Sequence, residues 1–389
     1  IGGATTSRAH TAIKIAPNYP QPVVYVPDAS RAVGVVSRLL SETQAEPFKA
    51  EVAADYEKLR VQHASKKGVQ LVTLEEARAN RPTLNYAPVE PRRPGVTVLR
   101  DIDLAGLVDF IDWGPYFQTW DLSGSYPGIL DDAKVGPEVA EQARNVFNDA
   151  SAMLRQIVDE KWLTAHAVFG LFPANAEGDD VAVYTDETRT VRRATLHGLR
   201  QQQKRPDSKP NQCLSDYIAP AGTPDWIGAF TAGIGIEIKL AEFMAAHDDY
   251  HAIMLKSLAD RLAEACAEWL HLRVRREDWG YAASEDLTLA AMIREEYCGI
   301  RPAAGYPACP DHTEKGVLFE LIDAPGNAGM TLTESYAMMP AAAVSGLYFA
   351  HPESHYFAIS KIGRDQLEDW ALRKGMDIST AERWLAPIL

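Results

Sequence analysis

The chain has 389 residues and 46% hydrophobic content, which is ordinary for a protein of two or three domains with a sizeable core. Lys and Arg number 39 against 53 Asp and Glu, and the formal net charge of -14 disfavours nucleic acid and anionic membranes as partners. No apolar run reaches the roughly 18 residues that a membrane-spanning helix needs. The 4 cysteines are too scattered for a disulfide framework, so we expect a cytoplasmic protein.

The first 65 residues show a strand-to-helix pattern. The opening "IGGATTSRAH" has no initiator methionine, and we interpret the chain as a piece of a longer polypeptide. Residues 23–26 form a β-rich run, and residues 30–40 follow with a helical pattern. A second helical pattern ends at Gly68, which suits a helix C-cap. Residues 1–65 are therefore predicted to be the last part of an α/β domain.

A polar, proline-rich segment follows, and it predicts an extended linker over residues 66–97. Beyond it, residues 139–157 carry apolar side chains spaced alternately by four and three residues, which predicts an amphipathic helix beginning at Pro137. Another long helix is predicted over residues 240–275, with Cys266 on its apolar stripe. We interpret this cysteine as a core residue.

Strand patterns lie elsewhere, at residues 181–187 and 316–322. Two more, residues 345–351 and 355–362, are separated only by the turn-like "PES", and we predict that they pair as an antiparallel hairpin. Helices and hairpins that do not alternate regularly predict an α+β domain over residues 98–389, with a twisted antiparallel sheet and long helices.

The loop "RPAAGYPACPDHTEK" begins at Arg301 and allows three interpretations. Cys298, Cys309 and His312 are candidate zinc ligands, but their spacing fits a structural zinc site poorly. Cys309 is a weak candidate nucleophile because Pro310 follows it on a rigid turn. The third interpretation is a stiff loop that binds a small zwitterion. It would use the Arg301 guanidinium, the neighbouring tyrosine, and backbone groups that cannot all pair with one another.

Acidic and aromatic side chains cluster in "GLVDFIDWGPYFQTW". Asp109 and Asp112 lie beside Trp113, Tyr116 and Phe117, and such a combination can hold an ammonium or sulfonium group. In the alternative, which the spacing alone favours, the aromatic residues belong to the core and the acids cap a helix.

Many stretches taken together resemble the C-terminal part of cobalamin-dependent methionine synthase, over nearly the whole chain. They include "GGATTSRAHTAIKI", "VYVPDASRAVGVVSRLL", "IDWGPYFQTW", "HDDYHAIMLKSLADRLAEACAEWLH", "GIRPAAGYPACPDHTEK", "LTESYAM", "AVSGLYFAHPESHYFAISKIGRDQLEDWA" and "ERWLAPIL". Their shared order is more specific than any single motif.

The resemblance implies that residues 1–65 end a Rossmann-like cobalamin-binding domain and that residues 98–389 form the activation domain. It implies a role in methionine biosynthesis, in which this region binds S-adenosylmethionine and supports reductive methylation of inactive cob(II)alamin to methylcobalamin. The implied cofactors are S-adenosylmethionine and cobalamin, and the implied partners are the protein's own cobalamin-binding domain and flavodoxin or an equivalent reductase. The alternative is a docking scaffold for those partners without ligand binding of its own.

The resemblance also assigns residues by motif position. The S-adenosylmethionine contacts would be Asp112, Arg301, Tyr306, Tyr356 and Phe357. Cobalamin contacts would be Gly2, Gly3 and Ala29, and the residues that face the docked cobalamin domain would be Asp260 and Glu264. The ligand's carboxylate suits an arginine and its ammonium suits Asp112.

No catalytic residue is expected, because methyl transfer from a sulfonium to strongly nucleophilic cob(I)alamin needs alignment rather than acid-base chemistry. The family's cobalt-ligand histidine motif does not occur in this sequence, and we expect it upstream of Ile1. The same holds for the folate module and for the zinc and homocysteine module, so zinc is expected only there. We expect a methyltransferase family member that does not make methionine by itself.

Overall fold

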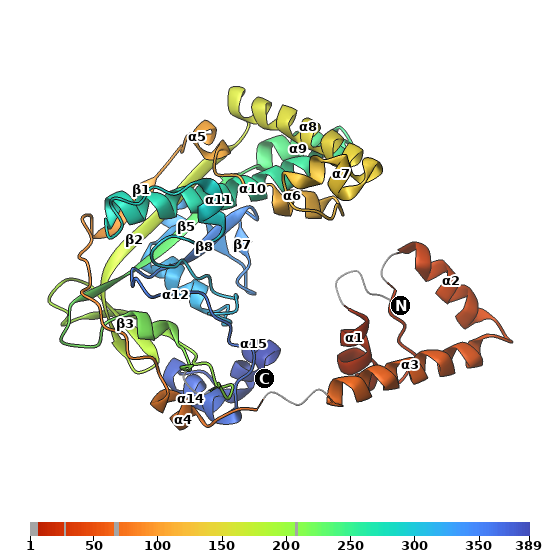
Figure 1. Ribbon diagram of the computed structural model, residues 1–389, viewed down its shortest axis with the longest axis horizontal. Helices are drawn as coiled ribbons and strands as arrows, with labels where there is room; N and C mark the ends of the chain where they lie inside the picture. The colour runs from red at the N-terminus through yellow and green to blue at the C-terminus, as the bar shows by residue number, and fades with distance from the viewer. Residues whose placement is uncertain (1–6, 27–28, 66–69, 207–208) are drawn as a thin grey trace. The chain divides into compact units, whose positions relative to one another are not determined.

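The structure is a computed structural model that describes residues 7–26, 29–65, 70–206 and 209–389. Side chains of residues 29–31 and 62–65 are outside that description. The chain divides into two compact units, Ile1–Gln70 and Leu71–Leu389 (Figure 1). Across the described residues, no helix is both long enough and apolar enough to cross a membrane.

The regular elements described in the smaller unit are all helical. Its elements are α1 (Arg8–His10), η1 (Thr11–Ile15), η2 (Ala16–Asn18), α2 (Ala29–Leu40) and α3 (Ala45–Ser65). The two predicted helical patterns correspond to α2 and α3. The predicted strand at residues 23–26 is wrong, because only Tyr25 there makes an isolated β-bridge. The Tyr25 N–H donates to the Tyr56 hydroxyl at 2.9 Å.

The larger unit is built on a six-stranded antiparallel sheet, as counted over its described residues. The strand order is β4-β3-β2-β5-β8, and β1 also pairs with β2. The strands are β1 (Gly95–Leu99), β2 (Thr164–Glu177), β3 (Asp180–Tyr184), β4 (Arg192–His197), β5 (Asp225–Gly235) and β8 (Ala343–Tyr348). A separate pair is formed by β6 (Thr331–Leu332) and β7 (Met338–Met339).

Helices cover both faces of this sheet (Figure 1). One face packs against a layer that includes α5 (Leu104–Val108), α6 (Gly114–Thr119), α8 (Pro137–Asp159) and α10 (Asp249–Arg273). The other face packs against α12 (Glu314–Leu321) and α13 (Ala324–Ala328). Side chains alternate along a strand, so Phe169 of β2 faces the α10 layer while Val168 faces α12. The central strands are therefore buried on both faces.

The remaining elements connect or extend these layers. They are α4 (Leu74–Ala79), η3 (Gly128–Leu130), α7 (Asp132–Val135), η4 (Leu214–Tyr217), α9 (Glu237–Ala245), η5 (Val274–Asp278), α11 (Leu289–Ile293), α14 (Arg364–Lys374), α15 (Ile378–Leu385) and η6 (Ala386–Ile388). The C-terminal helices form a third apolar cluster around Trp370.

The expected α+β architecture with an antiparallel sheet and long helices is confirmed, and α8 begins at Pro137 as predicted. The helix predicted over residues 240–275 is interrupted between α9 and α10. His247 there has a left-handed backbone with φ of 55°. The Asp248 side chain accepts a hydrogen bond from the His251 N–H, so α10 begins with its own cap.

Two strand predictions for the larger unit are wrong. Residues 316–322 lie mainly in α12, where the apolar run is long enough for two helical turns and packs against the sheet. Residues 355–362 form no strand, and β8 pairs with β5 rather than with them. Short apolar runs have the same composition in buried helices and strands, which explains the error at residues 316–322.

The extended linker predicted for residues 66–97 differs from the structure, because residues from Leu71 onward belong to the larger unit. This segment contains α4, whose capping box joins the Thr73 hydroxyl to the Glu76 N–H and the Glu76 carboxylate to the Thr73 N–H. Leu74 is buried. Farther along, the Val89 carbonyl accepts from the Trp279 indole at 2.7 Å.

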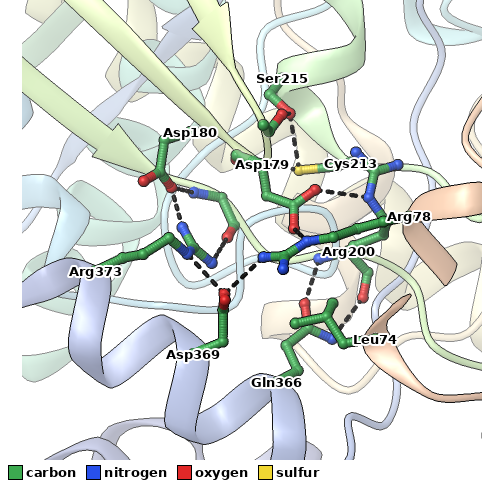
Figure 2. A network of polar contacts seen from close by, with 12 residues as sticks. Leu74, Arg78, Asp179, Asp180, Arg200, Cys213, Ser215, Gln366, Asp369 and Arg373 are labelled. Atoms are coloured by element: carbon green, nitrogen blue, oxygen red, sulfur yellow. Dashed lines mark hydrogen bonds and ion pairs between the residues drawn. The ribbon is translucent and has the colours of Figure 1, made fainter. Parts of the chain in front are cut away.

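A buried ionic network fixes α4 against the turn after β2 and against α14 (Figure 2). Arg78 of α4 donates to Asp179 and to Asp369, each at 2.7 Å. Arg200, which is 1% exposed, donates from Nε to Asp179 at 2.7 Å and from both terminal nitrogens to Asp216 at 2.8 Å. The start of the larger unit is thus held by paired charges.

Candidate functional site

Arg301 begins a loop that is joined to the end of the sheet. Ile300 and Phe349 exchange both backbone hydrogen bonds at 3.0 Å, just after β8. The Leu347 N–H donates to the Pro302 carbonyl at 2.9 Å, and the Ile359 N–H donates to the Pro307 carbonyl at 2.8 Å. The loop therefore takes its position from the sheet rather than from its prolines alone.

The Arg301 guanidinium lies in a buried polar cluster. Its Nη2 donates to Glu268 Oε2 at 2.6 Å, and its Nη1 contacts His271 Nδ1 at 3.2 Å and the Tyr297 hydroxyl at 3.3 Å. The Arg301 N–H donates to the Tyr356 hydroxyl at 3.0 Å, and that hydroxyl lies 3.3 Å from the Tyr297 hydroxyl. Burial alone would lower the pKa of Arg301, but Glu268, Tyr297 and Tyr356 together outweigh it, so the pKa is raised and the charge is retained.

Helix α10 brings three acids to this region at intervals of four residues. Asp260 and Glu264 are exposed, whereas Glu268 is only 7% exposed. Residues four apart lie on one face of an α-helix. The acidic stripe therefore runs from the surface of α10 down to the ion pair with Arg301.

Two adjoining cavities open at this cluster, and they share Glu264, Glu295, Arg301 and Tyr356 in their walls. The first has a volume of about 340 Å³ and is also lined by Asp112 and Glu268. The second has a volume of about 380 Å³ and is also lined by Tyr306 and Phe357. All five residues expected to contact S-adenosylmethionine thus line one continuous pair of cavities, and two of them line both.

Asp112 has two roles in the structure. Its Oδ1 accepts from the Gly114 N–H at 2.9 Å at the start of α6, and the residue also lines the first cavity. Tyr116 and Phe117 are fully buried in the α10 layer, which makes them core residues as the alternative interpretation predicted. Asp109 is exposed at the end of α5. Asp112 is available to a ligand in the first cavity, whereas the buried rings of Tyr116 and Phe117 are not.

The loop backbone is better paired than the sequence suggested. The Tyr306 N–H donates to Ala303 O at 3.2 Å, and the Gly305 N–H donates to Cys309 O at 2.7 Å. Gly305 has φ of 92°, and a Cβ at this position would approach the His312 ring to 2.2 Å. A glycine is therefore required, and the sharp turn leaves Tyr306 63% exposed at the mouth of the second cavity.

The zinc and nucleophile interpretations lose their support. In the part of the chain that the structure describes, no group of three or more His, Cys, Asp or Glu residues is placed to hold a metal ion. Burial raises the pKa of Cys298, and it raises the pKa of Cys309 well above its usual value, so both remain protonated thiols at neutral pH. His312 lies against the Gly305 turn instead. These residues have structural roles.

The predicted cobalamin contacts cannot be placed in the same way. Gly2 and Gly3 lie outside the described residues, and Ala29 is described only as the first residue of α2. Asp260 and Glu264, predicted to face a docked domain, are both on the exposed part of α10, but Glu264 also lines both cavities. These assignments remain predictions.

Sequence reasoning missed Glu268, His271 and Tyr297, which surround the guanidinium, and Glu295 in the cavity walls. One signal was available, because "ACAEWLHL" places an acid and a histidine inside an otherwise apolar run of a helix. Charged residues are seldom fully buried unless they are paired, so such a position indicates a partner.

Comparison with known proteins agrees with this geometry. A family model described as "Vitamin B12 dependent methionine synthase, activation domain" matches residues 103–375. The structure is also similar to a crystal structure described as the MetH reactivation domain bound to AdoHcy, with a TM-score of 0.78 and 49% sequence identity. That match covers 82% of this chain and 98% of the other. The chain belongs to the family of activation domains of vitamin B12-dependent methionine synthases.

Proposed function

We propose that the paired cavities bind S-adenosylmethionine and that the larger unit presents this methyl donor for the reactivation of methionine synthase. The observation that carries the proposal is the position of Arg301, whose guanidinium lies at the junction of two cavities that acids and tyrosines line. The similar MetH reactivation domain was crystallised with AdoHcy, the product left when S-adenosylmethionine loses its methyl group.

The residues present fit this ligand. Its carboxylate suits the guanidinium, because a charged fork can bind both carboxylate oxygens. Its ammonium and sulfonium groups are cationic and suit the side of the cavities lined by Asp112, Glu264 and Glu295. The second cavity offers Tyr306 and Phe357 as surfaces for the adenine ring.

Reduced cobalamin carried by the cobalamin-binding domain would supply the nucleophile that takes the methyl group and leaves AdoHcy, and flavodoxin or an equivalent reductase would supply the electron that reduces it. In this proposal the residues of the larger unit bind and orient the donor and hold its charged groups, and no side chain acts as an acid or base. Alignment of reacting atoms can by itself supply a large part of a rate enhancement. The chain supports methionine synthase in this way and does not make methionine by itself.

Isothermal titration calorimetry of the whole chain with S-adenosylmethionine tests the proposal. The wild type is expected to bind, and Arg301→Ala is expected to bind at least tenfold more weakly because a charge-assisted contact is lost. Arg364→Ala is a matched control, since this arginine of α14 is 57% exposed and pairs with surface acids. Absence of binding by the wild type would contradict the proposal.

The docking scaffold without ligand binding remains the competing interpretation. It predicts that charge reversal at Glu264 abolishes association with a separately expressed cobalamin-binding domain while no binding of S-adenosylmethionine is detected. Pull-down of the two purified proteins, measured beside the calorimetry, distinguishes the two.

A further inference from the structure

The loop that begins at Arg301 is also held at its far end, where Asp311 precedes α12. Asp311 is 1% exposed, and its two oxygens accept from the Thr313 N–H and from the Thr313 hydroxyl, each at 2.8 Å. These contacts satisfy the oxygens but do not balance the negative charge, and a buried charge is costly unless it is paired. The end of the loop therefore depends on a cation from another part of the fold.

Lys374, in the last turn of α14, supplies that cation. Its Nζ forms ion pairs with Asp311 and with Glu314 Oε1, the latter at 2.6 Å, and all three side chains are largely buried. Burial alone would lower the pKa of Lys374, but Glu314 and Asp311 together outweigh it, so the pKa is raised and the charge is retained. One lysine thus joins α14 to the end of the loop and to the first residue of α12.

Helix α14 is anchored by contacts that do not involve this loop. Leu367 and Trp370 are buried in the third apolar cluster, with the C-terminal helices. Arg373 donates to Asp369 at 2.8 Å and also pairs with Asp180 at the start of β3 (Figure 2). The helix therefore gives Lys374 a fixed base.

A tightly packed turn connects Asp311 to Tyr306. The Cys309 N–H donates to Tyr306 O at 2.9 Å, and the Gly305 N–H donates to Cys309 O at 2.7 Å. The ring of His312, the residue after Asp311, lies so close to Gly305 that a Cβ there would approach it to 2.2 Å. The turn moves as one piece, so a shift of Asp311 displaces Tyr306 as well.

Resting on the proposed function, we propose that Lys374 is a positioning residue for the S-adenosylmethionine site. It does not line either cavity at Arg301. It acts by holding Asp311, and through Asp311 the turn that places Tyr306 at the mouth of the second cavity. The sheet holds the beginning of the loop and α14 holds its end, so the site is preorganised between them.

Hydrogen–deuterium exchange of the full chain tests this positioning without any ligand. Lys374→Met removes the charge and keeps an unbranched side chain. We expect the amides of residues 305–309 to exchange about tenfold faster than in the wild type, because the turn is released at one end. Lys374→Arg retains the charge and should restore slow exchange. Unchanged exchange in Lys374→Met overturns the inference.

Arg373→Met is the matched control, since it removes a partly buried cation from the neighbouring position of α14. Its partners, Asp180 and Asp369, lie outside the loop. The variant is expected to lower the Tm while exchange at residues 305–309 stays slow. Equally fast exchange in Arg373→Met and Lys374→Met would mean a general loosening of α14, which overturns the inference.

Asp311→Asn replaces Lys374→Met where that variant fails to fold. It keeps the shape of the side chain and removes the charge that Lys374 attracts, while leaving Lys374 paired with Glu314. The same faster exchange at residues 305–309 is expected. Exchange as slow as in the wild type then overturns the inference.

Calorimetry with S-adenosylmethionine on the full chain links the positioning to binding. Affinity is expected to fall about tenfold in Lys374→Met, as is usual for coupled residues of one network, and to stay unchanged in Arg373→Met. In a Tyr306→Ala background, where no ring is left to place, Lys374→Met should cost much less. An equal loss in both backgrounds overturns the inference. A wild type that binds no S-adenosylmethionine contradicts the proposed function instead, and the exchange experiment still decides whether Lys374 holds the turn.

Discussion

Two buried arginines of the larger unit, Arg200 and Arg301, differ in how many of their N–H groups contact carboxylates of the protein. Arg200 contacts two carboxylates, Asp179 and Asp216, and its Nη1 also donates to a backbone carbonyl at 2.7 Å. Arg301 contacts one carboxylate, that of Glu268, whose second oxygen is buried without a partner among the described residues. Both guanidinium groups keep their charge, but Arg200 is paired with two carboxylates and Arg301 with one.

The difference separates a structural arginine from a binding arginine. Around Arg200, four of five donors are used by groups that belong to the fold. Around Arg301, Glu268 Oε1 is buried without a donor among the described residues, and both residues line one cavity. A buried charge is stable only when its partners are complete, so an incomplete set points to a partner that arrives from solution.

The largest expected effect is on stability at Arg200. Arg200→Ala removes the cationic partner of buried Asp216 and leaves Asp179 paired with Arg78 alone, and breaking such a buried pair costs about 3–5 kcal/mol. Urea unfolding followed by circular dichroism measures this loss in the free energy of unfolding. Arg78→Ala, at a 38% exposed partner of Asp179, is expected to cost less and replaces Arg200→Ala if that variant does not fold. Equal stability of Arg200→Ala and wild type would contradict the comparison.

Arg301→Ala is expected to show the reverse pattern. Affinity for S-adenosylmethionine should fall by about 2 kcal/mol or more, which is roughly thirtyfold. The loss in free energy of unfolding should be smaller than in Arg200→Ala, because one acid rather than two loses its contact with the arginine. Calorimetry and urea unfolding on the same preparations give both values. A larger stability loss at Arg301 than at Arg200 would reverse the assignment.

The surroundings of Arg301 should also make the free energy of unfolding depend on pH, through His271. Burial, and then the nearby Arg275 and Arg301, hold the pKa of His271 well below its usual value. Below a pH of about 6.5 the unfolded chain takes up a proton at this histidine and the folded chain does not, so the free energy of unfolding falls as the pH is lowered.

Urea unfolding of wild type and His271→Asn at pH 7.5 and 5.5 measures this response. We expect the wild type to lose more stability than the variant over that interval, since the variant has no imidazole to protonate at this position. Other buried histidines contribute equally to both proteins, and the comparison cancels them. A pH dependence that is identical in the two proteins would exclude a neutral His271 as the acceptor for Arg301.

The smallest expected effect concerns α4, which the Arg200 network holds in place. Thr73→Ala removes one half of the capping box and is expected to cost about 1 kcal/mol of stability. Thr83→Ala, in the irregular chain after α4, is the control and should change little. Affinity for S-adenosylmethionine should be the same in both variants, because neither position lines the cavities at Arg301.

The parts of the fold that the sequence predicted are those with one buried face. Helix α8 shows a clear period of apolar residues, and α10 shows the same stripe from Met254 to Cys266. The central strands β2 and β5 were missed because both of their faces are buried. They therefore lack the alternation that identifies a half-exposed strand, and they contain many Ala and Gly residues.

Some residues of the candidate site could likewise be predicted from the sequence, and others could not. Local chemistry pointed to Arg301, Tyr306 and Asp112, the resemblance added Tyr356 and Phe357, and all five line the cavities. Glu268 was not found, since an acid within a buried helix contradicts the usual pattern and its partner is 33 residues away in the sequence. Only the folded chain shows that this acid and Arg301 form one unit.

Helix α10 also fixes the distance between residues at its exposed part and residues near Arg301. Asp260, Glu264 and Glu268 follow one face of it, from residues predicted to meet the cobalamin-binding domain to the residue that holds Arg301. With a rise of 1.5 Å per residue, the eight residues from Asp260 to Glu268 span about 12 Å. A rigid helix keeps that separation constant. The separation between exposed Asp260 and Glu268, the partner of Arg301, is thereby set by the geometry of one helix.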